Sequence, residues 1–205
     1  MRLIRIWAGL CFAFAILPLQ AALPEQPISL DYYYRWQQLM QADHGLDELA
    51  LVHKVDRFVN QAEYRTDQAR FAREDVWSAP DEFFSQAEGD CEDFAIAKYF
   101  TLIAMGVPME RLQLVYGKLT DTDTEHMVLR YQPGNGASAL LLDNITLTAT
   151  TEDVRKDFQP IYQFDQQHLW LMNNGEPLLT GQGTLQTPQW QRVLQRWQPR
   201  WLALN

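Results

Sequence analysis

Cys91 is the residue of this chain whose chemistry is easiest to define, because a cysteine thiolate is a strong nucleophile. The chain has 205 residues and two cysteines, and the other one, Cys11, lies in the apolar N-terminal stretch. Cys91 stands in the run Gly-Asp-Cys-Glu-Asp, directly before a strongly apolar segment. If the N-terminal stretch is removed on export, Cys91 has no disulfide partner. It is then either a buried inert thiol or a reactive one.

Two segments with strand-like composition supply a base and an orienting carboxylate for such a thiol. The first begins near His126 and the second ends near Asp143, and the run Pro-Gly-Asn-Gly between them is a strong hairpin signal. If the turn centres between Gly134 and Asn135, His126 pairs with Asp143, with Cβ atoms roughly 5 Å apart. One imidazole nitrogen would then hold the aspartate, and the other could face Cys91. These are the parts of a nucleophilic triad.

Three acidic residues, Asp90, Glu92 and Asp93, flank the thiol. Asp90 is a favoured residue at a helix N-cap, and acids in the first turn complement the helix dipole. A helix N-terminus lowers the pKa of a thiol, whereas neighbouring negative charge raises it. Carboxylate oxygens can also bind Ca²⁺, although this is not the twelve-residue EF-hand pattern. Two interpretations are therefore open, helix capping with solvation and a calcium site.

The segment that follows Cys91 is expected to be the central helix of the domain. Residues Phe94 to Met105 are apolar on nearly every side, which is typical of a fully buried helix. Gly106 and Pro108 are expected to end it. Upstream, apolar residues at helical spacing predict further helices between Leu30 and Ala72.

Downstream the periodicity changes to that of strands. Strands are predicted at Leu112–Tyr116, His126–Tyr131, Ala139–Leu142 and His168–Met172, and a last helix is predicted from Pro188. Helices followed by antiparallel strands indicate an α+β fold. In that fold we expect the helix that begins at the cysteine to pack on an antiparallel sheet.

The first 21 residues have the pattern of a secretory signal peptide. Arg2 and Arg5 precede an apolar run from Ile6 to Leu17, and small residues follow at Ala21. The apolar run is shorter than the roughly 20 residues that span a bilayer. We therefore expect a cleaved signal peptide over residues 1–21 and one exported domain over residues 22–205.

The charge of the chain restricts its partners. It has 17 basic and 26 acidic residues and a net charge of −9. Loss of the two arginines of the signal peptide would take the net charge to about −11. Such a surface argues against nucleic acid and anionic lipid as partners, and it is compatible with a divalent cation.

Three motifs in order resemble the bacterial transglutaminase-like cysteine proteinases, the LapG group. They are the Gly-Asp-Cys-Glu-Asp run with its apolar helix, the run Glu-His-Met-Val-Leu and the run Leu-Asp-Asn, and the likeness is densest from Trp77 to Asn144. The resemblance implies a papain/transglutaminase-like core. It also implies a triad in which Cys91 is the nucleophile, His126 the general base and then acid, and Asp143 the orienting carboxylate.

The same resemblance implies a cofactor, a substrate and a partner. Members need Ca²⁺ beside the nucleophile, and Asp90 and Glu92 match the acidic positions tied to it, with Asp93 a weaker candidate. Members are periplasmic and cut the N-terminal region of a large cell-surface adhesin at a di-alanine site, which releases cells from a biofilm. An inner-membrane cyclic-di-GMP receptor of the LapD type sequesters them.

Two other functions fit the same core. A transglutaminase or acyltransferase would use the same Cys-His-Asp set, with an amine instead of water resolving the thioester. A non-catalytic binding module would keep only the fold, and the intact set of three residues argues against it. A shared fold does not determine the acceptor, so protease and transferase are separated only by an assay.

Overall fold

The computed structural model of the chain describes residues 28–42, 45–73, 75–134, 136–173 and 176–197. The predicted signal peptide over residues 1–21 lies outside the described residues. Within the described ranges, no helix combines the length and the apolar character that a membrane crossing requires.

Helices form the first part of the described chain, as the sequence predicts. The region from Leu30 to Ala72 contains α1, α2 and α3, with one short strand, β1, between the last two. The helices are α1 (Ile28–Ala42), α2 (Glu48–Val59), α3 (Asp67–Phe71), α4 (Pro80–Gln86), α5 (Cys91–Ala104) and α6 (Pro188–Arg196), with 3₁₀ turns at Met109–Arg111 and Glu152–Val154.

The strands form two sheets. A short parallel pair consists of β1 (Glu63–Tyr64) and β2 (Glu88–Gly89). The main sheet is antiparallel, with the strand order β6-β5-β4-β3-β7-β8-β9. Its strands are β3 (Leu112–Leu119), β4 (Glu125–Tyr131), β5 (Leu140–Leu142), β6 (Thr150–Thr151), β7 (Phe158–Phe164), β8 (His168–Asn173) and β9 (Glu176–Gln182).

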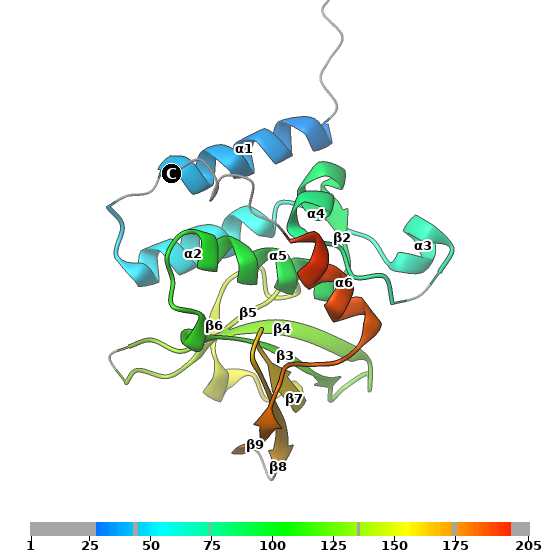
Figure 1. Cartoon of the computed structure of the whole chain (residues 1–205). Coiled ribbons are helices and arrows are strands. Elements are labelled where there is room, and N and C mark those ends of the chain that lie inside the picture. Colours follow the sequence, from blue (N-terminus) through cyan, green and yellow to red (C-terminus); the bar gives the residue numbers. More distant parts are fainter. Residues whose placement is uncertain (1–27, 43–44, 74, 135, 174–175, 198–205) are drawn as a thin grey trace, which may run out of the picture.

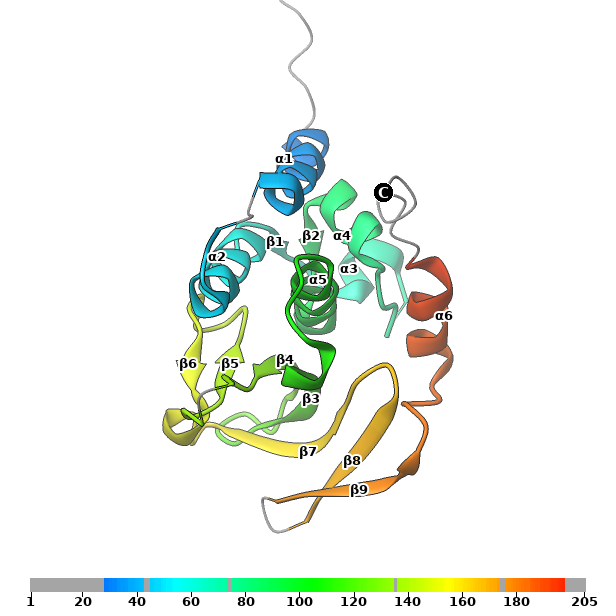
Figure 2. The same ribbon diagram turned by 60° about the vertical axis from the view of Figure 1, so that its left-hand side comes forward.

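Helix α5 lies at the centre of the molecule, between the sheet and the other helices (Figures 1 and 2). It contacts β3 and β4 on one side and α2 and α4 on the other. Its side chains at Ile96, Tyr99, Phe100 and Leu102 are completely buried. The all-round apolar pattern is therefore explained by burial on every side, and each such side chain contributes about 1.5–3 kcal/mol. The α+β class, with the Cys91 helix packed on an antiparallel sheet, is confirmed.

Local signals set the ends of these helices. The Asp47 side chain caps α2 by accepting a hydrogen bond from the Ala50 backbone N–H at 2.9 Å. Thr187 caps α6 in the same way. Gly106, with a φ of +94°, follows the end of α5, where the sequence predicts a stop.

A buried ion pair joins α5 to α2. The Lys98 ammonium lies 2.8 Å from the Asp56 carboxylate, and both side chains are inaccessible to solvent. Burial lowers the pKa of Lys98 and raises that of Asp56, and the mutual attraction of the two charges opposes both shifts. Removal of one partner would leave the other charge buried and uncompensated.

We therefore expect Lys98→Met to lower the free energy of unfolding by about 3–5 kcal/mol. The double variant Lys98→Met with Asp56→Leu should recover much of that loss, because neither charge then remains buried alone. Urea denaturation of the three proteins at one calcium concentration measures this. A single variant within about 1 kcal/mol of wild type would contradict the expectation.

The β4–β5 hairpin has a different register from the expected one. Leu129 pairs with Leu142, whereas the expected register would place Leu140 opposite Leu129. The ladder ends at Leu142, so His126 and Asp143 are not paired residues. Because the shift is by two residues, it preserves which side chains share a face. The two side chains therefore still meet, as diagonal neighbours beyond the end of the ladder.

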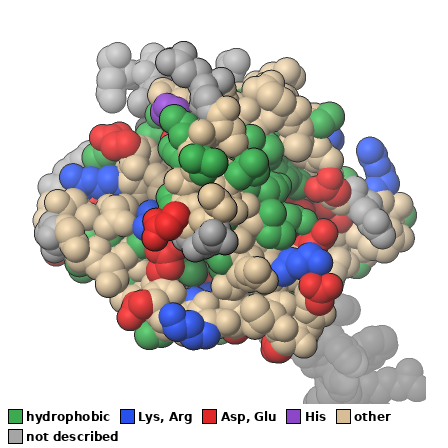
Figure 3. Space-filling view, turned by 90° about the horizontal axis from the view of Figure 1, so that it is seen from below, with side chains coloured by type: hydrophobic (Ala, Val, Ile, Leu, Met, Phe, Trp, Pro, Cys, Tyr) green, Lys and Arg blue, Asp and Glu red, His purple; other side chains and the backbone are tan. Residues whose placement is uncertain are grey.

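The far part of the main sheet extends beyond the helices. Strands β8 and β9 form a hairpin that projects from the body of the molecule (Figures 1 and 2). Figure 3 views the molecule from the side toward which this hairpin projects, and hydrophobic side chains gather there among scattered charges. The exposed large hydrophobic residues of β7, β8 and β9 are Ile161, Leu171, Leu178 and Leu179.

Candidate active site

Cys91 is the first residue of α5, and its half-buried side chain opens into a cavity. The cavity has a volume of about 390 Å³ and is lined by Cys91 and His126 together with Trp77, Asp90, Glu92 and Tyr116. The thiol donates a hydrogen bond to Glu92 Oε2 at 3.1 Å. Helix α5 and strand β4 thus bring the predicted nucleophile and the predicted base to the same cavity.

His126 and Asp143 are in direct contact. The distance between His126 Nε2 and Asp143 Oδ1 is 2.9 Å, and both side chains are buried. Asp143 Oδ1 also accepts a hydrogen bond from the Ile145 backbone N–H at 2.9 Å, and Oδ2 accepts one from Arg155 at 2.6 Å. Burial alone would raise the pKa of Asp143, but the bonds from His126, Ile145 and Arg155 outweigh it and hold that pKa below its usual range.

The imidazole is also held by an aromatic ring. The rings of His126 and Phe158 are 6.0 Å apart and nearly perpendicular. Gly117, which pairs with His126 across β3 and β4, makes this possible, because a Cβ at Gly117 would lie 2.8 Å from the Phe158 ring and 2.3 Å from the Gln159 carbonyl oxygen. The ladder between β3 and β7 is also irregular at Gly117. The imidazole orientation therefore depends on three strands.

The surroundings of the thiol disfavour its ionisation. Desolvation raises the pKa of Cys91 well above its ordinary value, and the charge and hydrogen bond of Glu92 raise it further. A backbone hydrogen bond from Met127 acts in the opposite direction. The lowering expected from the helix N-terminus is thus outweighed by burial and by the adjacent carboxylates. An efficient nucleophile at this position requires compensating positive charge.

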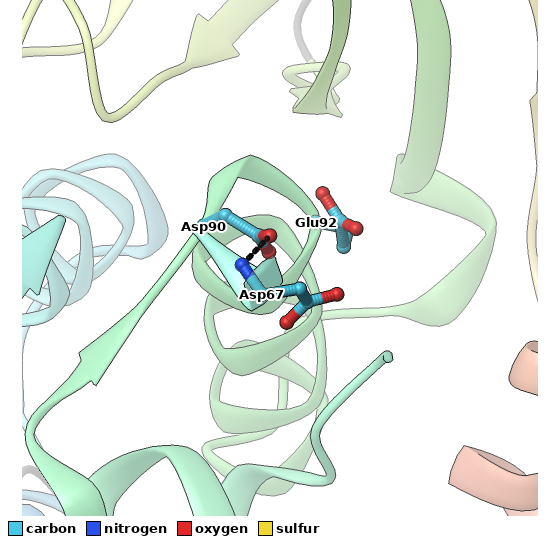
Figure 4. A group of neighbouring side chains, drawn as sticks. All are labelled: Asp67, Asp90 and Glu92. Atoms are coloured by element: carbon cyan, nitrogen blue, oxygen red, sulfur yellow. Dashed lines mark hydrogen bonds between the residues drawn. The ribbon is translucent and has the colours of Figure 1, made fainter. Parts of the chain in front are cut away.

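The carboxylates of Asp67, Asp90 and Glu92 converge at the N-terminus of α5 (Figure 4). One oxygen from each lies within 4.8 Å of the others. Asp90 Oδ1 and Asp67 Oδ1 are buried and have no hydrogen-bond partner among the described residues. Oxygen ligands on opposite sides of one Ca²⁺ are about 5 Å apart, so the group has the size and chemistry of a calcium site.

These three carboxylates have little compensating charge from the protein. Burial raises the pKa of Asp90 to about 9, and it also raises the pKa values of Asp67 and Glu92. Arg70 lies 3.6 Å from Asp67 Oδ1. Within the part of the chain that the structure describes, neither Asp90 nor Glu92 forms an ion pair with lysine or arginine. A divalent cation would supply the missing charge.

Asp93 does not belong to this group. Its completely buried carboxylate forms an ion pair with Arg70 and accepts hydrogen bonds from the Ser78 backbone N–H at 2.7 Å and from the Ser78 hydroxyl at 3.1 Å. These contacts hold Asp93 against the loop before α4. Asp93, the weakest of the three metal candidates from the sequence, therefore already has protein partners for its carboxylate. Asp67 is the third member of the group in its place.

Asp90 occupies the N-cap position of α5, as predicted, but its side chain does not cap the helix. Its Oδ2 accepts a hydrogen bond from the Asp67 backbone N–H at 3.2 Å, which Figure 4 shows as a dashed line. The expected capping function is thus wrong. The side chain is directed instead toward the start of α3 and the group of carboxylates.

The parallel pair of β1 and β2 explains why Asp67 is beside Asp90. Glu63 pairs with Glu88 and Tyr64 with Gly89, and the Arg65 backbone N–H continues the ladder to the Gly89 carbonyl at 2.8 Å. Both strands then lead in the same direction into the starts of α3 and α5. Sequence analysis missed Asp67 because nothing in its local pattern distinguishes it from an ordinary acid in a first helical turn.

Arg155 is the second residue of the site that sequence analysis missed. It is buried beside Asp143, and its guanidinium also bonds Asp157 Oδ1 at 2.9 Å and Oδ2 at 3.0 Å. Asn60, which follows the end of α2, donates a hydrogen bond to the Asp143 backbone carbonyl at 2.9 Å. Side chain and backbone of Asp143 are thus both fixed by residues that no motif or spacing connects to it.

Comparison with known protein families agrees with this geometry. Residues 34–167 match the family described as bacterial transglutaminase-like cysteine proteinase. The chain belongs to this family. The matched residues include every residue that lines the cavity, Cys91 and His126 among them. They also include Asp143, Asp67 and Arg155. No curated protein sequence matches the chain.

Two solved structures of LapG are similar to this chain over most of its length. EGTA-treated LapG from Legionella pneumophila is 32% identical, with a TM-score of 0.73, and the match covers 84% of this chain and 91% of that one. Calcium-bound LapG from the same organism is 32% identical, with a TM-score of 0.71, and the match covers 85% and 93%. The fold is therefore that of a LapG-like cysteine protease.

Proposed function

We propose that this protein is a calcium-dependent cysteine endopeptidase of the periplasm, which cuts the N-terminal region of a large cell-surface adhesin and so promotes release from a biofilm. Cys91 is the nucleophile, His126 the general base and then acid, and Asp143 the orienting carboxylate. The observation that carries the proposal is the shared cavity of Cys91 and His126, with His126 Nε2 fixed by a buried carboxylate.

The tautomer of His126 determines the direction of proton transfer. When Nε2–H is donated to Asp143 Oδ1, Nδ1 carries the lone pair and is free to accept the thiol proton. The sulfur of Cys91 then attacks the scissile carbonyl carbon, and the imidazolium returns its proton to the leaving amine. Water, deprotonated by the same nitrogen, hydrolyses the thioester.

The position of Cys91 also serves the oxyanion. The backbone N–H of the first helical residue has no acceptor within the helix, because the first four N–H groups of an α-helix lack such partners. It can therefore donate to the carbonyl oxygen as negative charge develops there. The completely buried body of α5 holds this donor and the thiol in a fixed relation to each other.

Calcium is proposed because the clustered carboxylates lack compensating charge and because a related structure is calcium-bound. The group of Asp67, Asp90 and Glu92 would hold the ion, with two buried oxygens, Asp67 Oδ1 and Asp90 Oδ1, that accept no hydrogen bond from the described residues. Calcium-bound and EGTA-treated forms are described for Legionella LapG. Bound Ca²⁺ supplies positive charge beside the thiol. The protein's own part is to place the three carboxylates at the starts of α3 and α5, which follow two paired strands.

Substrate, partner and compartment are proposed from the family resemblance. The adhesin is the substrate, and an inner-membrane cyclic-di-GMP receptor of the LapD type sequesters the enzyme. One feature of the sequence supports a periplasmic location, the pattern of a cleavable signal peptide over residues 1–21.

Removal of calcium is expected to abolish cleavage and to destabilise the fold. A ligand that binds only the folded state stabilises it by about 2.7 kcal/mol at a hundredfold excess over its Kd. Chelation should therefore lower the melting temperature and stop cleavage of secreted adhesins, and Ca²⁺ should restore both. Mg²⁺ should substitute poorly, because it demands tighter octahedral geometry. N-terminal sequencing of the products maps the cut site, and the mass of the fragment with the new C-terminus distinguishes a carboxylate, formed by hydrolysis, from an amide, formed by amine transfer.

The new ligand assignment gives a sharp control. Asp67→Asn should imitate chelation in calorimetric titration, in melting temperature and in cleavage. Asp75→Asn should not, because Asp75 lines the same cavity but lies outside the group of three carboxylates. If chelator-treated wild type binds no Ca²⁺ at millimolar concentration, the calcium proposal is wrong and these acids have only a structural role.

A further inference from the structure

A row of aromatic and aliphatic side chains leads from the catalytic cavity to the free edge of the sheet. Tyr116 of β3 pairs with Tyr162 of β7, which pairs with Leu171 of β8, which pairs with Leu178 of β9. Residues that pair directly in antiparallel strands point to the same face. We propose that this row binds an extended apolar segment of the polypeptide substrate beside the scissile bond.

The row begins inside the cavity and becomes more exposed along its length. Tyr116 lines the cavity that contains Cys91. The rings of Tyr116 and Tyr162 stack with centroids 4.8 Å apart and an angle of 18° between their planes. Leu171 is 49% exposed and Leu178 is 59% exposed. The two tyrosines thus join the exposed leucines to the reactive centre without interruption.

The row lies on the face of the sheet that is covered by helices near its centre. On β7, Phe164 occupies the same face as Tyr162 and is completely buried, with its ring 5.1 Å from that of Trp190 of α6. Beyond this point the helices end, and β8 and β9 continue alone (Figure 2). A contiguous set of exposed apolar side chains on a soluble domain usually marks an interaction surface.

Continuity with the cavity identifies the occupant. A cysteine proteinase must place the substrate backbone against Cys91, and from there the row extends over three spacings between neighbouring strands, about 14 Å, or roughly four extended residues. The segment is apolar because it contacts leucine and tyrosine. It avoids acidic residues near the cavity, because Asp75, Glu92 and Glu125 line the cavity. The inference deepens the proposed function and rests on it.

The test compares a long substrate with a short one. The long probe is an N-terminal fragment of the large surface adhesin from the same cells, and the short probe is a peptide of about two residues on each side of the mapped cut, which is too short to reach Leu171 and Leu178. In the double variant Leu171→Ser with Leu178→Ser, kcat/KM for the fragment should fall about tenfold or more, mainly through KM. Cleavage of the short peptide and labelling of Cys91 by iodoacetamide should stay at wild-type rates.

Leu179→Ser is the matched control. Leu179 is adjacent to Leu178 and 48% exposed, but it pairs with Trp170 and so points to the opposite face. It should cut the fragment as wild type does. The inference is overturned if the double variant cuts the fragment normally, if the control loses as much, or if the double variant loses only self-association or receptor binding. If wild type itself cuts no adhesin fragment, the proposed function fails first.

Discussion

Cys91→Ala is expected to reduce cleavage of the adhesin by on the order of 10⁶-fold, to the background rate. The residue is the only free thiol in the described part of the chain, and it opens into the cavity that His126 also lines. Without the sulfur no thioester forms, and among the described residues no second cysteine, serine or threonine lines the cavity beside the base. Cleavage is followed by electrophoresis of the adhesin fragment at saturating calcium.

The fold should survive this change. Alanine is a better helix former than cysteine, and the side chain is at the surface of the cavity, so the melting temperature should change little. Calorimetric titration with Ca²⁺ should show the same stoichiometry as wild type, because the three carboxylates remain. A variant that binds calcium and still cuts at the wild-type rate would remove Cys91 from the mechanism.

Asp143→Asn is expected to reduce kcat by about 10⁴-fold. An asparagine can present its N–H₂ group to Nε2, which places the proton of the imidazole on Nδ1, the nitrogen that must accept the thiol proton. The charge that stabilises the imidazolium is lost as well. Arg155 keeps a bidentate partner in Asp157, so we expect the melting temperature to fall only slightly.

Asp157→Asn is the control that tests whether Asp143 acts on His126 directly or only by holding Arg155 in place. Asp157 bonds the same guanidinium as Asp143, but its carboxylate makes no contact with His126. Its substitution should leave kcat within about an order of magnitude of wild type. Equal losses in the two variants would show that Asp143 acts through Arg155 and the local fold, and not by orienting the imidazole.

Much of the fold could be predicted because its signals are local. The apolar run after Cys91 has no polar face, so it had to be the central helix, and the hairpin between His126 and Asp143 is marked by its Pro-Gly-Asn-Gly turn. The predicted register of that hairpin was wrong by two residues, because a turn motif does not determine the geometry of a connection as long as the one between Tyr131 and Leu140. A register shift of two residues does not change which side chains share a face of the sheet. The contact of His126 with Asp143 was therefore still predicted correctly.

The sequence by itself determined which residues have reactive chemistry and which family the chain resembles. The nucleophile, the imidazole, the carboxylate and two of the three clustered acids are all in short motifs, where spacing along the chain carries the information. The catalytic and metal roles given to them, like the signal peptide, the adhesin and the receptor, stay predictions.

Only the tertiary structure decided which distant residues complete the site. Asp67 reaches Asp90 because β1 and β2 pair in parallel, and Arg155 reaches Asp143 because the chain after β6 folds back onto the end of β5. Asp93, adjacent to the cluster in sequence, is turned away to Arg70 by one step of the helix. Contacts of this kind depend on how packed elements meet, and no local periodicity encodes them.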